Sequence, residues 1–267
     1  MLSICTPTHN TPAYVLARTW ASLKRQTLRP EHWEWVIYDD SSNQRAWLQL
    51  YGICSDERYN VRVYKSNQPT GGNIGAAKRN AFMLAHGKWL VELDHDDELT
   101  PNALEEIHRT IQTAEYEPIF LYSDWCEIDS NGASTTYPEG WGQGFGTTKK
   151  TNIPIYGEVY QHSIDTSHPD HLTHIVSIPN HVRVWNADRY RHINGHDPSL
   201  TICDDYDLYL RTLKGICHFK TYIQHIPKLL YIQHTGPHTQ QRKRNHLIQK
   251  LVPKIYEKHY PERMKKT

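Results

Sequence analysis

A short apolar segment that ends in a cluster of carboxylates is the feature that most constrains this chain. It reads Trp89-Leu90-Val91-Glu92-Leu93-Asp94-His95-Asp96-Asp97. An apolar run of this length is typical of a buried strand, and open α/β sheets bind ligands beyond the carboxyl ends of their strands. Crowded carboxylates need a positive charge between them, and Mg²⁺ or Mn²⁺ combines carboxylate ligands with phosphate oxygens. The run predicts a divalent-cation site at a sheet edge, the alternative being a solvated acidic turn.

Strand and helix signals alternate along the first half of the chain. Apolar runs predict strands over residues 2–6, 33–38, 61–64, 89–93 and 119–122. Thr11-Pro12 and Thr100-Pro101 each place a capping residue before a proline, which is typical of a helix start. A glycine-rich loop over residues 71–75 precedes an expected helix over 76–86. This alternation predicts an α/β fold with a mostly parallel central sheet and helices on both faces.

The pattern changes after residue 131. The segment 131–175 is rich in glycine and polar residues, and we expect it to form a long irregular loop of functional importance. Strands are expected over 182–185, 219–223 and 229–232, and helices over 204–213 and 242–259, the last one broken at Pro253. No repeat or linker divides the chain. We therefore predict one domain over residues 1–239 and a basic helix and tail over 240–267.

The charge of the chain is small but uneven. The net charge is +1, whereas residues 240–267 contain nine Lys and Arg against two Glu. Such a basic end favours at most a peripheral membrane contact, and the alternative is a solvated helix. No apolar run reaches the roughly 18 residues of a membrane span, no secretory signal is visible, and the five cysteines form no CxxC pair. These features predict a cytoplasmic protein.

Four polar motifs follow in a fixed order. They are Thr6-Pro7-Thr8-His9-Asn10, Asp39-Asp40-Ser41-Ser42, Asp94-His95-Asp96-Asp97 and Cys203-Asp204-Asp205-Tyr206-Asp207-Leu208-Tyr209-Leu210-Arg211. In this order they resemble the family-2 glycosyltransferases of the GT-A fold, with their patterns P-T-x-N, D-D-x-S, D-x-D-D and E-D-x-D-L-x-x-R. Residues 73–80 and 194–197 resemble further segments of that family. The resemblance covers about residues 2–235 and implies a Rossmann-like domain that binds a nucleotide sugar. It also implies inverting transfer of a sugar from a nucleoside diphosphate to an acceptor hydroxyl.

The resemblance also implies roles for individual residues. Asp96 would bind the metal directly, Asp94 would lie beside it, and His234 would be a further ligand. The cofactor would be Mn²⁺ or Mg²⁺. The donor site would be formed by Pro7, Thr8, His9, Asp40, Asn73, Lys78, Arg79, Asp94 and His95.

Within that donor site, Asp40 would read the nucleobase, and Lys78 and Arg79 would reach the diphosphate. For Asp40, an ordinary turn or capping aspartate remains the alternative. For Lys78 and Arg79, the alternative is a solvated helix cation.

Asp205 is the expected general base, which takes a proton from the acceptor hydroxyl as its oxygen attacks the anomeric carbon. An acidic first turn that stabilises the helix dipole is the competing interpretation. Trp141 and Tyr156 are expected to line the acceptor site, because aromatic faces stack on sugar rings. His162, His168, His171 and His174 lie close in sequence, but their spacing and the lack of cysteine partners disfavour a zinc site.

Other functions remain open at this stage. A sugar-phosphate nucleotidyltransferase would need a glycine-rich, arginine-containing loop after the first strand, where this chain has residues 6–10. A non-catalytic glycan-binding module would need no base such as Asp205, and a carboxylate-pair glycosidase has no specific support. We expect a nucleoside-diphosphate sugar and a glycan or other hydroxyl acceptor as partners, and no nucleic acid. The identities of the sugar, the base and the acceptor are left open.

Overall fold

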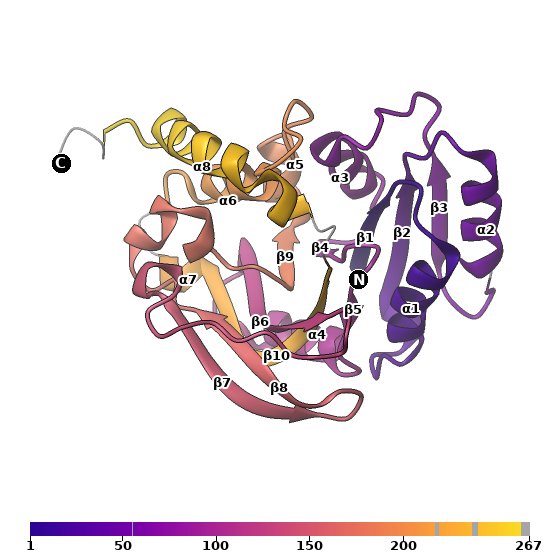
Figure 1. The fold of residues 1–267 in the computed structure, drawn as a ribbon, viewed down its shortest axis with the longest axis horizontal. Helices are drawn as coiled ribbons and strands as arrows, with labels where there is room; N and C mark the ends of the chain where they lie inside the picture. The colour runs from indigo at the N-terminus through magenta and orange to yellow at the C-terminus, as the bar shows by residue number, and fades with distance from the viewer. Residues whose placement is uncertain (55, 217–218, 237–239, 263–267) are drawn as a thin grey trace.

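One curved ten-stranded sheet runs through the molecule (Figure 1). The computed structural model describes residues 1–54, 56–216, 219–236 and 240–262. The strands are β1 (Leu2–Thr8), β2 (Trp33–Asp39), β3 (Val61–Lys65), β4 (Trp89–Glu92), β5 (Glu98–Leu99), β6 (Phe120–Asp129), β7 (Gly146–Ile153), β8 (Gly157–Ile164), β9 (Arg183–Asn186) and β10 (Ile223–Thr235). The main sheet has the order β3-β2-β1-β4-β9-β6-β10-β5, and the β7–β8 hairpin joins it through β6.

The sheet is mostly parallel, as the alternation of strand and helix signals predicts. β3, β2, β1 and β4 all run parallel, with Leu2 of β1 opposite both Trp33 of β2 and Trp89 of β4. β9 lies antiparallel between β4 and β6, and β10 runs parallel to β6. Every residue of β1 is buried, which agrees with a strand covered on both faces. The predicted α/β fold is confirmed.

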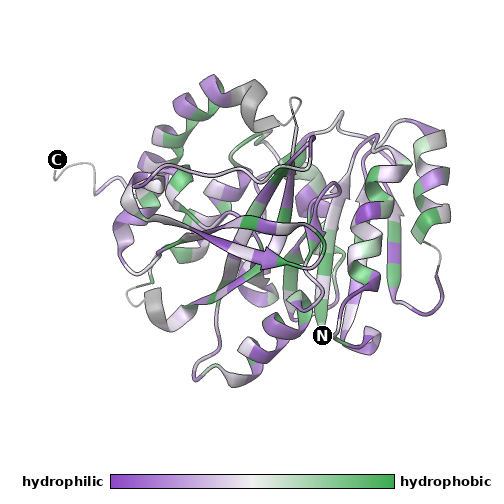
Figure 2. Cartoon of the chain, turned by 60° about the horizontal axis from the view of Figure 1, so that its bottom comes forward, coloured by the Kyte–Doolittle hydropathy of each residue, from purple (hydrophilic) through white to green (hydrophobic). Residues whose placement is uncertain are grey.

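Helices cover both faces of the sheet. They are α1 (Ala13–Lys24), α2 (Gln44–Cys54), α3 (Ile74–Met83), α4 (Ala103–Thr113), α5 (Ala187–His192), α6 (Asp204–Leu213), α7 (Phe219–Tyr222) and α8 (Gln240–His259). Short 3₁₀ turns occur at Pro30–His32, Gly142–Gly144, Pro169–Thr173 and Ile175–Ser177. One hydrophobic cluster lies under α1, α2 and α4, and a second lies under α3, α5, α6 and α8. Figure 2 shows hydrophobic residues concentrated on the central strands between these layers.

The segment 131–175 is more regular than its sequence predicts. In place of a long loop it contains the β7–β8 hairpin, which pairs from Gly146 opposite Ile164 to Ile153 opposite Gly157. Most side chains of β7 are exposed or half-buried. Because the hairpin strands bond mainly to each other, β7 needs no continuous apolar face, so the hydrophobic pattern that indicates a strand is missing.

Two further expectations about secondary structure are wrong. Residues 219–223 were expected to form a strand, but Phe219–Tyr222 form α7, and β10 begins at Ile223. The last helix is not broken at Pro253, because α8 continues through it. Pro253 lies on the exposed side of α8, while Val252 and Ile255 are buried in the second hydrophobic cluster and hold the helix on both sides of the proline.

α8 packs against α6 at the end of the described chain. The His259 Nε2 atom lies 2.7 Å from Asp207 Oδ1, and the Tyr260 hydroxyl donates to the Leu210 carbonyl at 3.2 Å. The described part of the chain contains no helix that is long and apolar enough to cross a membrane. Residues 263–267 of the basic tail lie outside the described residues, and a membrane contact of residues 240–267 stays a prediction.

The start of α3 leaves no room for a side chain at Gly75. A Cβ there would lie 2.6 Å from the Leu200 carbonyl oxygen and closer still to that of Asp197. We expect Gly75→Ala to lower the free energy of unfolding by about 1–3 kcal/mol, because backbone must move to admit the methyl group. Gly52→Ala in α2 is the matched control: nothing lies within 4 Å of the added Cβ. It should be neutral or raise the stability by about 0.5–1 kcal/mol. Urea denaturation measures both, and equal effects would contradict the packing described here.

Candidate active site

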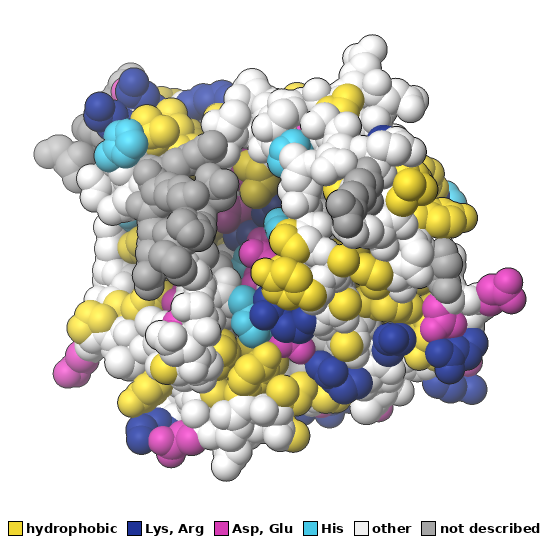
Figure 3. All heavy atoms as spheres, turned by 45° about the vertical axis from the view of Figure 1, so that its right-hand side comes forward, with side chains coloured by type: hydrophobic (Ala, Val, Ile, Leu, Met, Phe, Trp, Pro, Cys, Tyr) yellow, Lys and Arg dark blue, Asp and Glu magenta, His cyan; other side chains and the backbone are white. Residues whose placement is uncertain are grey.

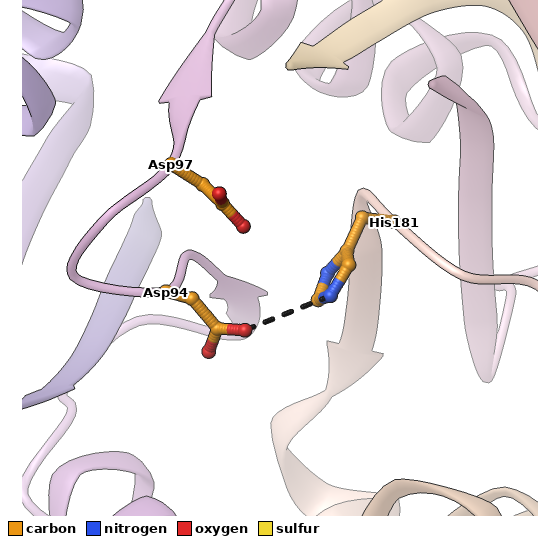
Figure 4. A group of neighbouring side chains, drawn as sticks. All are labelled: Asp94, Asp97 and His181. Atoms are coloured by element: carbon orange, nitrogen blue, oxygen red, sulfur yellow. Dashed lines mark ion pairs between the residues drawn. The ribbon is translucent and has the colours of Figure 1, made fainter. Parts of the chain in front are cut away.

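Two carboxylates and an imidazole converge beyond the carboxyl end of β4 (Figure 4). Asp94 and Asp97 come from the loop between β4 and β5, and His181 comes from the segment before β9. One ligand atom from each of the three lies within 4.8 Å of the others. Figure 3 shows a hollow on this side of the molecule in which acidic, basic and histidine side chains gather.

The donor atoms of this group suit a divalent cation. Burial, together with the nearby charges of Asp96 and Asp94, raises the pKa of Asp97. Burial and the Arg183 charge lower the pKa of His181 to about 4, so its imidazole is neutral at pH 7. Neutral imidazole is the form that binds metals, and the buried His181 Nδ1 has no hydrogen-bond partner among the described residues. A cation here would offset two repelling carboxylates, so the residues fit the predicted metal.

A buried ion network supports this group from behind. Arg183 donates to both carboxylate oxygens of Glu92, from Nε at 2.9 Å and from Nη2 at 2.8 Å. Lys78 Nζ lies 2.5 Å from Glu92 and 3.6 Å from Asp94. Burial opposes the charge of Glu92, but Arg183 and Lys78 hold its pKa well below its usual value. The network therefore keeps three charged side chains, those of Glu92, Lys78 and Arg183, in one place with little access to water.

The same arginine holds the predicted base. The Arg183 Nη1 donates to Asp205 Oδ2 at 2.7 Å, and the Tyr206 amide donates to Asp205 Oδ1 at 2.8 Å. Asp205 is the second residue of α6, and its side chain keeps 25% of its surface exposed. Burial would raise the pKa of Asp205, but the charges of Arg183 and Lys78 lower it. Asp205 is thus ionised at neutral pH and partly exposed.

Asp204, its neighbour, has a different environment. The carboxylate is buried, its Oδ2 has no hydrogen-bond partner among the described residues, and it lies 3.8 Å from His196 Nε2. Burial raises the pKa of Asp204 to about 7, against the opposing charge of Lys78. Two adjacent aspartates on one helix are therefore expected to differ in protonation at neutral pH.

The predicted nucleobase residues meet at the ends of β1 and β2. Asp40 is fully buried, and its carboxylate accepts from the Thr70 amide, the Thr70 hydroxyl and the Gly72 amide at 2.7–3.2 Å. The His9 Nδ1 atom lies 3.0 Å from the Asp40 carbonyl oxygen, and the His9 ring lies against Gly72. Pro7 and Thr8, the last residues of β1, are buried beside them. In this structure Asp40 orders the loop over residues 70–72.

The predicted diphosphate residues point in different directions. Lys78 faces inward from α3 to Glu92 and Asp94. Arg79 instead donates to Asn194, at 3.1 Å to its carbonyl oxygen and 2.6 Å to its side chain. Asn73 caps α3 by accepting from the Ala76 amide at 3.2 Å. The structure therefore brings Lys78 to the acidic group and does not bring Arg79 there.

The predicted metal ligands share only Asp94 with the group in Figure 4. The His234 ring contacts Glu98, at 2.9 Å from Nε2 to Oε1, while the His234 amide donates to Asp97 at 2.7 Å. Asp96 and His95 are half-buried, and their backbone carbonyls accept hydrogen bonds from Arg18 and Thr19, respectively. Their predicted roles stay predictions.

Sequence reasoning assigned no role to His181, Glu92 or Arg183, and it placed Asp97 within a motif without a separate role. His181 has no motif around it that marks it as a ligand. Glu92 and Arg183 do carry a signal, since each is a charged residue at the end of a buried, mostly apolar strand. Such a residue is rarely buried without a partner.

The two aromatic residues expected at the acceptor site, Trp141 and Tyr156, lie in different parts of the structure. Tyr156, at the tip of the β7–β8 hairpin, donates from its hydroxyl to Glu98 at 2.6 Å and lies near His234. Trp141 packs instead in a cluster with Trp125, Tyr137 and His162. Tyr156 is therefore the one beside the acidic site.

Fold and site together define a GT-A type domain. The sequence profile described as Glycosyl transferase family 2 matches residues 3–171, and the chain belongs to that family. The fold likeness extends further: TarS from S. aureus in complex with UDP-GlcNAc superposes with a TM-score of 0.65 and 15% identity. That match covers 96% of this chain and 66% of TarS. A second TarS structure, in complex with UDP, gives a TM-score of 0.62 at 16% identity, over 96% of this chain and 65% of that one.

Curated relatives support the family assignment. The putative colanic acid biosynthesis glycosyl transferase WcaA of Escherichia coli is 32% identical over 104 residues, 39% of this chain and 35% of WcaA. Chondroitin synthase of Escherichia coli is 27% identical over 237 residues, 86% of this chain and 28% of that protein. The chain spans less than half of the length of the curated relatives it matches.

The high pKa of Asp204 makes the stability of the domain depend on pH. Between about pH 4 and pH 7 the folded chain holds a proton that the unfolded chain has released, so the free energy of unfolding falls as pH rises through this range. Asp204→Asn removes this dependence. Between pH 4.5 and pH 7.5, the free energy of unfolding of the wild type should fall by more than ~1 kcal/mol relative to that of the variant. Urea denaturation at both values tests this, with the exposed Asp188→Asn as control; parallel curves for wild type and Asp204→Asn would refute it.

Proposed function

We propose that this chain is an inverting, metal-dependent glycosyltransferase that moves a sugar from a nucleoside diphosphate to an acceptor hydroxyl. One observation carries the proposal: Arg183 connects Asp205 to the edge of the sheet where Asp94, Asp97 and His181 converge, within a domain of glycosyl transferase family 2. UDP and UDP-GlcNAc in the TarS structures favour a nucleoside-diphosphate sugar as donor. Residues 1–239 would form the transferase domain, with the basic helix and tail over 240–267 packed on or trailing from it.

Asp205 would act as the general base. Its carboxylate is ionised, partly exposed and held in place by Arg183 and by the Tyr206 amide. A base held in this way takes the proton of the acceptor hydroxyl as the oxygen attacks the anomeric carbon, on the face opposite the leaving group. Such catalysis contributes about 10²–10⁴ in rate.

Asp94, Asp97 and His181 would hold the divalent cation. When bound, Mn²⁺ or Mg²⁺ supplies positive charge that offsets the charge of the departing diphosphate. The chain itself provides the positive charge of Lys78, which lies 3.6 Å from Asp94. Six carboxylates interact here with one another or with two buried cations, Lys78 and Arg183. They are Glu92, Asp94, Asp96, Asp97, Asp204 and Asp205. Even with Asp204 protonated, the carboxylates outnumber these two cations. This excess of negative charge supports a bound cation.

Asp205→Asn should abolish sugar transfer and leave donor binding intact. The amide keeps the shape of the side chain but cannot take a proton, so the rate should fall at least about 100-fold. Release of nucleoside diphosphate from a panel of nucleotide sugars measures the reaction, and calorimetry measures donor binding. Asp188→Asn, an exposed aspartate on α5, is the control and should behave as wild type. Unchanged transfer in Asp205→Asn would remove it from the mechanism, and glycan binding without any nucleotide binding would favour a non-catalytic module.

Removal of divalent cations with EDTA should stop the release of nucleoside diphosphate, and Mn²⁺ should restore it. Mn²⁺ affinity, measured by calorimetry without any substrate, distinguishes two candidate sets of metal ligands. One is the group in Figure 4, and the other includes Asp96 and His234, which the family resemblance implies. Asp97→Asn and His181→Ala should each weaken Mn²⁺ binding at least about tenfold if the group in Figure 4 is the site. If only Asp96→Ala and His234→Ala weaken it, the ligands are those implied by the family resemblance and this group is not the site. Full activity without metal would refute both.

A further inference from the structure

A second hollow of about 410 Å³ lies between the segment 136–141 and the β7–β8 hairpin. We call it the hairpin groove. Aromatic, hydroxyl and cationic side chains line it: Tyr137, Trp141, Tyr160, Thr147, Lys149 and Lys150. None of these residues belongs to the acidic site described above.

The groove has a rigid aromatic wall. The Trp141 indole N–H donates to Thr148 Oγ1 at 3.1 Å, and the ring meets Trp125 edge-on with centroids 5.7 Å apart. The Tyr137 ring lies 4.8 Å from Trp141. A Cβ at Gly146 would clash with the Trp141 ring, so this glycine lets the indole lie directly on the strand. The wall is therefore fixed before any ligand arrives, which lowers the entropic cost of binding.

The open side of the groove is polar and carries charges of both signs. Lys149 and Lys150 are both exposed, and Lys150 lies 5.8 Å over the Tyr160 ring and 2.7 Å from Glu158. Glu139 is the acidic residue in the lining. The lining thus combines flat apolar faces with several hydrogen-bond donors.

We propose that the hairpin groove binds the acceptor of this enzyme and that the acceptor is a glycan chain of several sugar units. This inference rests on the proposed glycosyltransferase function. Sugar rings present flat C–H faces that stack on aromatic rings, and their hydroxyls pair with hydroxyl and ammonium groups at the rim.

The hairpin links the groove to the acidic site. At its tip, Tyr156 contacts Glu98, which bonds to His234, whose amide in turn donates to Asp97. The pair Lys150 and Tyr160 lies three register positions from the tip pair Ile153 and Gly157, or about 10 Å along the strands. Direct contacts therefore join the hairpin tip to the acidic site, and the groove lies further along the same hairpin.

Binding of defined oligosaccharides to the full chain tests the inference. The probes are hexasaccharides of hyaluronan, chondroitin, maltose and chitin, measured by calorimetry and by tryptophan fluorescence. We expect at least one hexasaccharide to bind the wild type. Tyr160→Ala and the double variant Lys149→Gln/Lys150→Gln should each weaken that binding at least about tenfold. Lys88→Gln is the matched control, because Lys88 is an equally exposed lysine paired with Glu117 at 2.8 Å.

The outcomes separate this inference from the proposed function. Groove variants should keep the wild-type melting temperature, nucleotide-sugar binding and the metal-dependent release of nucleoside diphosphate in water, while KM for a long acceptor rises. Asp205→Asn should still bind the hexasaccharide. If Asp205→Asn transfers sugar normally while the groove variants lose oligosaccharide binding, the assigned mechanism fails and the groove stands. If no hexasaccharide binds, or if the groove variants bind as tightly as Lys88→Gln, the groove proposal is overturned whatever the catalytic result.

Discussion

The buried ion pair between Glu92 and Arg183 is the interaction on which the site depends. It joins the end of β4 to the start of β9, and through Lys78 and Asp205 it fixes α3 and α6 to the same point. Taking these charges out of water is costly, and a buried ion pair often adds little net stability. Loss of one partner is different, since it leaves a buried charge unpaired at a cost of about 3–5 kcal/mol. The pair therefore acts mainly by fixing geometry.

The same network sets the chemistry of the site. Arg183 lowers the pKa of Asp205 and of Glu92, whereas Asp204, with no hydrogen bond on one oxygen, has a raised pKa. Neighbouring carboxylates thus reach different protonation states because one is paired and the other is only buried. An ionised carboxylate and a cluster of acidic side chains then occur in one site, as the proposed transfer from a diphosphate would require.

Sequence reasoning predicted the parallel half of the sheet well because its strands are continuous apolar runs, such as residues 33–38 and 89–93. It failed for the β7–β8 hairpin, whose strands bury little apolar surface, and at α7, where four residues are too few for a helical pattern. In the site, the motif order located Asp94, Asp97 and Asp205 within the right segments. Arg183 and His181 were missed because their roles arise from remote partners: Glu92 lies 91 positions from Arg183, and Asp94 and Asp97 lie 87 and 84 positions from His181.

The sequence by itself determined the family, the α/β architecture and the carboxylates at the strand ends, because local periodicity and motif order are properties of neighbouring residues. Only the tertiary structure decided which carboxylates are paired and which are free. Asp40 accepts hydrogen bonds from residues 70–72, His234 faces Glu98, and Asp97 meets His181. These choices depend on burial and on distances between remote segments, and both come into existence only when the chain packs.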